Sequence, residues 1–204
     1  MFQTSQSERT ATHIMPSERF FAACTKLDRR ATAVTVADLE GHDCPLIYAN
    51  TAFTDLTGYS FDELEGRNCR FLQGHGSCPD AVASIASAIT SRRDTAVRLR
   101  NYRKDGTPFD NLLILLLIGN PKTTRYVLGC QYVLRPNFRT DQGEVWQGAV
   151  KPGDPSSSQI DPVIWSSLIA RSDAIRLIFE ANHYTVEGFR PVAPSLALAG
   201  SEGH

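Results

Sequence analysis

The chain has 204 residues, of which 42% are hydrophobic and 21% are charged. This balance is typical of a globular protein that can bury a hydrophobic core. Lys and Arg number 21 against 22 Asp and Glu, a net charge of −1, so the charge gives no sign of binding to nucleic acid or to an anionic membrane. The N-terminus lacks the apolar run of a signal peptide, and the longest apolar run, at 112–118, is too short to span a bilayer. We therefore expect a cytoplasmic protein without a membrane or nucleic-acid partner.

The five cysteines are irregularly spaced. An odd number without a repeating interval argues against a disulfide framework. The sequence also lacks a CxxC motif and any paired Cys and His cluster, so we expect no metal site.

The first half of the chain predicts a hairpin followed by helices. Residues 1–16 are expected to be disordered, and 17–30 form a helical extension with apolar residues at helical intervals. Residues 31–39 and 46–50 are rich in β-branched and apolar residues and predict two strands of a hairpin. Glycines separate the short helical pieces that follow, and a longer amphipathic helix is predicted at 79–93.

Three further strands are predicted, at 95–103, 108–118 and 125–134. Consecutive strands at both ends with helices between them indicate an α+β fold, in which a five-stranded antiparallel sheet carries its helices on one face. Helices crossing such a sheet would enclose a pocket for a small ligand.

Residues 136–162 read as a linker because of their Gly, Pro and Ser content. Residues 163–184 then predict a helix, and 185–204 a disordered tail. The helix carries a stripe at three- and four-residue steps, which we expect to be buried on its own domain or on a second copy of the chain. The members of the stripe are Trp165, Leu168, Ser172, Ile175 and Phe179.

The stretch GRNCRFLQG, residues 66–74, places Cys69 between an amide and a permanent cation. Three interpretations follow from these residues alone. Arg70 could lower the pKa of the Cys69 thiol and make it a reactive nucleophile, or Cys69 could be an ordinary buried hydrophobe. In the third interpretation the polar neighbours hold a ligand while Cys69 faces it. An α-helical turn would put Cys69 and Gln73 on one face.

This stretch, together with LRNYRKDGTPFDNLL and LGCQY downstream, resembles the LOV (light-oxygen-voltage) family of flavin-binding blue-light sensors. The resemblance covers roughly residues 31–135 and implies the PAS fold. It implies FMN, or alternatively riboflavin, as the cofactor. It also implies a photoreceptor function, in which Cys69 forms a reversible bond with the light-excited flavin.

The resemblance also implies roles for the other residues of the site. Arg70 would pair with the phosphate of the flavin tail, because a planar guanidinium suits anionic oxygens. Asn68 and Gln73 would contact the ribityl chain and the ring edge. Amides that contact the ring are expected at Asn101, Asn111 and Gln131, and apolar walls at Leu72, Leu113, Leu115 and Val127.

One departure from the family concerns the phosphate: Ala86 stands where many members have a second arginine, and Arg92 and Arg93 further along the helix are expected to face solvent. The segment after the linker has no effector signature, so we do not expect an enzyme. The expected partner is a second copy of the chain, in a light-dependent homodimer, or an unidentified signalling protein. The alternative functions are a flavin- or other ligand-binding PAS module without photochemistry and a flavin oxidoreductase.

Overall fold

The computed structural model describes most of the region from the first predicted strand to the C-terminal helix. The described residues are 26, 28, 31–119, 124–134, 147–150 and 162–183. Of the predicted N-terminal extension, Lys26 and Asp28 are described and both are helical. The predicted disordered ends, the rest of that extension and most of the predicted linker lie outside the described residues. Among the described helices, none is both long and apolar enough to cross a membrane.

The strands within the described residues pair antiparallel in one sheet with the order β2-β1-β5-β4-β3-β6. The five predicted strands are confirmed, and a two-residue strand, β6, adds to them at the outer edge of β3 in a segment predicted to be linker. The strands are β1 Ala33–Asp38, β2 Leu46–Ala49, β3 Thr95–Tyr102, β4 Pro108–Leu117, β5 Tyr126–Val133 and β6 Gly148–Ala149.

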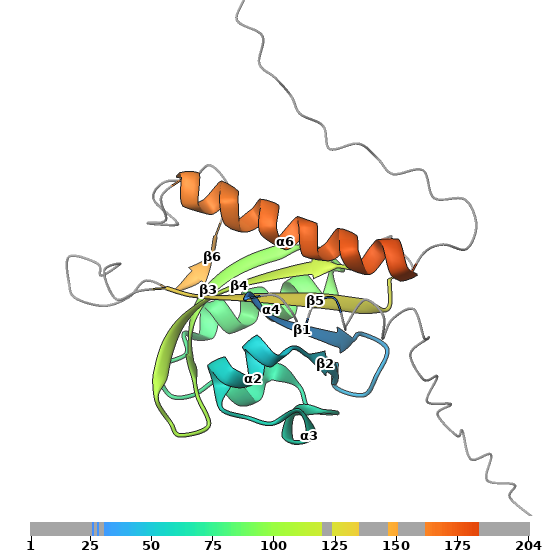
Figure 1. Ribbon diagram of the computed structural model, residues 1–204. Coiled ribbons are helices and arrows are strands. Elements are labelled where there is room, and N and C mark those ends of the chain that lie inside the picture. The colour runs from blue at the N-terminus through green and yellow to red at the C-terminus, as the bar shows by residue number, and fades with distance from the viewer. Residues whose placement is uncertain are drawn as a thin grey trace, which may run out of the picture.

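Three α-helices and one 3-10 helix connect β2 to β3 and cover one face of the sheet, here named the inner face (Figure 1). They are α2 Thr51–Thr57, α3 Phe61–Leu64, η1 Cys69–Leu72 and α4 Pro79–Thr90. Local sequence signals set their ends. Asn50 caps α2 by accepting from the Phe53 N–H, and Gly58 ends α2 with φ of 77°, a left-handed conformation that glycine adopts without strain.

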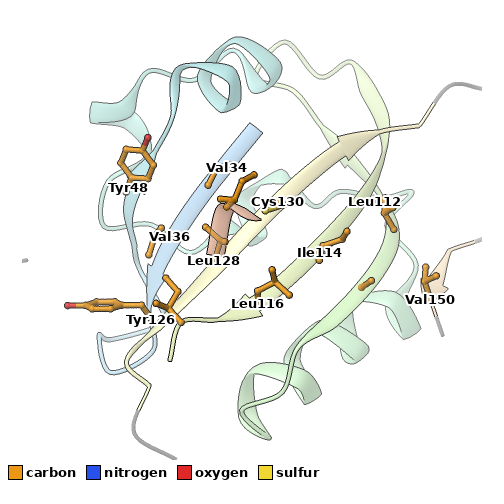
Figure 2. Packing of buried hydrophobic residues seen from close by; sticks show 13 residues of the cluster. Val34, Val36, Tyr48, Leu112, Ile114, Leu116, Tyr126, Leu128, Cys130 and Val150 are labelled. Atoms are coloured by element: carbon orange, nitrogen blue, oxygen red, sulfur yellow. The ribbon is translucent and has the colours of Figure 1, made fainter. Parts of the chain in front are cut away.

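The opposite, outer face of the sheet is covered by the C-terminal helix α6, Pro162–His183 (Figure 1). Strand alternation sends one apolar set to this face, including Val34, Ile114 and Leu128, and these side chains form a buried cluster (Figure 2). The predicted stripe of α6 packs against that cluster, with Ile175 and Ser172 buried and Trp165 and Leu168 partly buried. The side chain of Phe179 lies outside the described residues.

The stripe is therefore buried on the sheet of its own chain, one of the two predicted arrangements. A polar contact lies within this apolar interface, where the Tyr132 hydroxyl and the Ser172 hydroxyl share a hydrogen bond of 2.8 Å. Cys130 faces the same interface and is fully buried, as expected for a residue on the opposite side of β5 from Gln131.

Candidate functional site

A cavity lies between the inner face of the sheet and the helices η1 and α4. The hollow and its open mouth together enclose about 650 Å³. Ten of the eleven predicted site residues line it, and they come from η1 and its N-cap and from the inward-facing positions of β3, β4 and β5. They are Asn68, Cys69, Arg70, Leu72, Asn101, Asn111, Leu113, Leu115, Val127 and Gln131.

Gln73 is the predicted site residue that the structure does not place in the cavity lining. The cysteine segment is a 3-10 helix instead of the α-helical turn expected from the sequence. Because a 3-10 helix has three residues per turn, Cys69 shares its face with Leu72. Gln73 has already left the helix with φ of −80° and ψ of 154°.

The surroundings of Cys69 favour the neutral thiol. Burial is the largest cause that raises its pKa, Cys44 adds to it and a hydrogen bond with the Thr35 side chain opposes it, and together they raise the pKa of Cys69 to about 12. Arg70 does not activate the thiol, because its guanidinium bonds to Asp43. These contacts argue against the interpretation in which Arg70 makes Cys69 a thiolate nucleophile.

Two predicted amides form a chain across the cavity wall. Asn111 Nδ2 donates to Asn101 Oδ1 at 3.0 Å, and Asn101 Nδ2 donates to the Leu72 carbonyl at 3.3 Å. Asn111 is 1% exposed and Asn101 4% exposed. Within the described structure, the buried Oδ1 atom of Asn111 has no hydrogen-bond partner. A buried acceptor without a partner is costly, which favours a ligand N–H at this point.

Gln131 presents a second such acceptor from β5. Its Nε2 donates to Thr35 Oγ1 at 3.3 Å, while its buried Oε1 has no partner among the described residues. Gly129, directly opposite Thr35 in the sheet, keeps this part of the wall open. A Cβ added at Gly129 would lie 2.7 Å from Thr35 Oγ1 and 3.1 Å from Gln131 Nε2.

Arg70, at the mouth of the cavity, donates from Nη1 to both carboxylate oxygens of Asp43 at 2.6 Å. Asn68 Nδ2 donates to the Asp43 carbonyl at 2.6 Å. Asp43 and Cys44 both have positive φ, of 64° and 51°. This backbone conformation is uncommon for residues other than glycine, and the two contacts from the cysteine segment support it.

The residues considered for phosphate binding, Ala86 in α4 and Arg92 and Arg93 just after it, differ in part from expectation. Ala86 is exposed, and Arg93 faces solvent as predicted. Arg92 does not: it is half-buried, with φ of 49°, and its Nη1 donates to the Thr124 carbonyl at 2.7 Å.

Several lining residues were not predicted as part of the site. Thr35 and Ala37 alternate on β1, so the strand pattern could have placed them once β1 was known to pair with β5. Ile85 and Ile89 are four residues apart on the amphipathic α4, which is a signal for a shared face. The complete unpredicted set that lines the cavity is Thr35, Ala37, Cys44, Leu46, Ile85, Ile89, Leu99 and Gly129.

Comparison with known proteins identifies the family. A PAS-domain family model matches residues 33–133. Blue-light-activated histidine kinase 1 of Erythrobacter litoralis is 43% identical over 115 residues, which are 56% of this chain and 31% of that protein. The chain thus spans less than a third of this relative's length.

Solved structures agree. The LOV domain of a blue-light activated histidine kinase of Erythrobacter litoralis is 40% identical with a TM-score of 0.51, over 52% of this chain and 98% of that domain. The LOV protein of Rhodobacter sphaeroides is 29% identical with a TM-score of 0.58, over 82% of this chain and 94% of that protein. With its cysteine segment, amide chain and cavity in place, the chain belongs to the LOV family of PAS domains.

Proposed function

We propose that the chain is a blue-light photoreceptor that binds FMN in the cavity and forms a reversible bond between Cys69 and the flavin. The observation that carries this proposal is that one apolar cavity is lined by the Cys69 thiol and by two buried acceptor oxygens, Asn111 Oδ1 and Gln131 Oε1, that have no hydrogen-bond partner among the described residues. Family membership adds support, because a similar solved LOV structure, 36% identical with a TM-score of 0.52, was studied with a flavin analogue.

The amides suit the polar edge of a flavin ring. That edge carries an N–H between two carbonyl groups, so it needs both acceptors and donors from the protein. Asn111 Oδ1 offers an acceptor, and the amide chain through Asn101 fixes its orientation. The apolar walls formed by Leu113, Leu115 and Val127 would keep water from a bound ring.

When bound and excited by blue light, the flavin supplies an electron-poor ring carbon and an adjacent basic nitrogen. Cys69 would supply both the sulfur for a bond to that carbon and the proton for the nitrogen, and in darkness both would return to the thiol. A thiol with a raised pKa suits this chemistry, because sulfur and proton are both needed.

Absorption spectroscopy tests the proposal directly. The purified protein should be yellow, lose its blue absorbance under blue light and recover it in darkness. A yellow protein that does not bleach would indicate a flavin-binding module without photochemistry. A colourless protein that cannot be loaded with flavin would favour another ligand, and steady NAD(P)H consumption would favour an oxidoreductase.

Asp43 is expected to weaken the preference for FMN over riboflavin. Its carboxylate already neutralises Arg70, and with Ala86 exposed and Arg92 bonded elsewhere, the phosphate has no second arginine at the family position. Asp43→Asn should raise the FMN-to-riboflavin affinity ratio by a factor of about 2 to 5, the modest value expected of a half-exposed ion pair. Flavin titrations of the unloaded protein measure the ratio.

The matched control is Asp55→Asn, which removes the same charge from the exposed side of α2. Arg70→Ala should shift the ratio in the opposite direction. An unchanged ratio in both Asp43→Asn and Arg70→Ala would show that the phosphate does not bind at this mouth.

We further propose a light-dependent homodimer as the output. If light loosens α6, the outer face with Val34, Ile114 and Leu128 loses its cover, and a second copy can bury it. Light scattering should then give a larger mass in one light state than in the other. A monomer of constant mass and radius in darkness and light would exclude this output and leave a separate signalling protein as the partner.

A further inference from the structure

We propose that Thr35 is a positioning residue of the photochemical site, whose hydroxyl holds the Gln131 amide. The proposal rests on the proposed function, since it concerns how the amide next to the flavin ring is held. Thr35 is 4% exposed, lies on β1 and lines the same cavity as Gln131.

The contacts define what the hydroxyl does. Thr35 Oγ1 accepts from Gln131 Nε2 at 3.3 Å. Thr35 also lines the cavity together with Cys69, and its side chain lowers the pKa of the Cys69 thiol, against the effect of burial. A hydroxyl can accept and donate at once, so Thr35 can accept from the amide N–H and still donate its own O–H.

The sheet register makes this link feasible. Thr35 pairs with Gly129, and Gln131 is two residues further along β5, so the Thr35 and Gln131 side chains are diagonal neighbours on the inner face. Because Gly129 has no side chain, the Gln131 amide can reach across. A Cβ at Gly129 would crowd both the Thr35 hydroxyl and the amide nitrogen.

The link fixes the direction of the amide. With Nε2 bonded to Thr35, Oε1 is left as the free acceptor of Gln131. A flavin nitrogen that has gained the thiol proton is a donor, and an amide oxygen is its matching partner. Thr35 therefore stabilises the amide orientation that suits the light state, and its loss should shorten the lifetime of that state.

The test compares Thr35→Val, which keeps the shape and removes the hydroxyl, with Thr35→Ser, which keeps the hydroxyl. Losing one neutral hydrogen bond should speed dark recovery of the blue absorbance by about 2- to 10-fold in Thr35→Val. Thr35→Ser should recover at a rate near that of the original protein.

A second measurement needs no flavin. In the unloaded, ¹⁵N-labelled protein, the Gln131 side-chain amide protons, assigned by their absence in Gln131→Leu, should exchange with water faster in Thr35→Val than in Thr35→Ser. Unaltered exchange and unaltered recovery in Thr35→Val would overturn the proposal. Equal effects of Val and Ser on recovery would also overturn it, because they would indicate a role of shape alone. If the original protein binds no flavin or does not bleach, the proposed function fails, while the exchange measurement still decides whether Thr35 holds Gln131.

Discussion

Cys69→Ala is expected to bind flavin as the original protein does and to lose all light-induced change in blue absorbance. The thiol is the one group assigned to the covalent step, whereas binding depends on the amides Asn101 and Asn111 and on the apolar walls. Removing a half-buried sulfur from η1 leaves those contacts in place. Absorption spectra before and after blue light, with flavin content measured on the same samples, check both parts.

Cys78→Ala is the matched control, because Cys78 is also a half-buried free cysteine and precedes α4 outside the cavity lining. It should bleach and recover normally. A second thiol, Cys44, does line the cavity, and burial raises its pKa to about 11. Bleaching that persists in Cys69→Ala and disappears in the Cys69→Ala, Cys44→Ala double variant would transfer the covalent role to Cys44.

Much of the site could be predicted because successive side chains of a β-strand point to opposite faces of the sheet. Asn111, Leu113 and Leu115 are alternate residues of β4, so their side chains had to lie on one face of the sheet. Val127 and Gln131 are four residues apart on β5 and share a face for the same reason. The structure places all five in the cavity lining. The stripe of α6 was predictable for the same kind of reason, since its period of 3.6 residues marks the side that must be buried.

Short and irregular segments were less predictable. Two residues of β6 carry no periodicity, yet the segment is fixed by Gln147, whose Oε1 accepts from the Cys78 and Arg100 N–H groups at 3.0 Å and 2.8 Å. Its Nε2 also donates to the Gly76 carbonyl at 2.8 Å. These hydrogen bonds join parts of the chain that are far apart in sequence, so no local sequence pattern predicts them.

The cysteine segment and the cavity mouth are two further regions whose structure could not be predicted from the sequence. Four residues are too few for a helical period, so the sequence could not separate an α-helical turn from the 3-10 helix that excludes Gln73 from the cavity lining. The bond of Arg70 to Asp43 depends on two consecutive residues with positive φ. Neither is a glycine, so composition gave no signal for that loop.

Gln131→Leu is expected to bleach and recover in response to light but to lose the structural response in α6. Neighbouring side chains of β5 face opposite sides of the sheet: Gln131 faces the cavity, and Tyr132 shares its hydrogen bond with Ser172 of α6. A change at the Gln131 amide can therefore shift β5 and disturb a contact buried in the α6 interface. Leucine fills similar space but has no amide to respond to the protonated ring nitrogen.

Hydrogen exchange in darkness and light measures this response. In the original protein, residues 162–183 should exchange faster under blue light, because loosening the docked helix exposes its backbone N–H groups. In Gln131→Leu the hydrogen exchange of the same segment should be equal in darkness and in light.

Tyr132→Phe tests the contact between β5 and α6 separately from the contact between Gln131 and the flavin. This variant keeps Gln131 and the photochemistry but removes the hydroxyl bonded to Ser172, so α6 should exchange faster already in darkness. Equal light responses in the original protein and Gln131→Leu would show that the signal leaves the cavity by another path, and the link from β5 to α6 would then be purely structural.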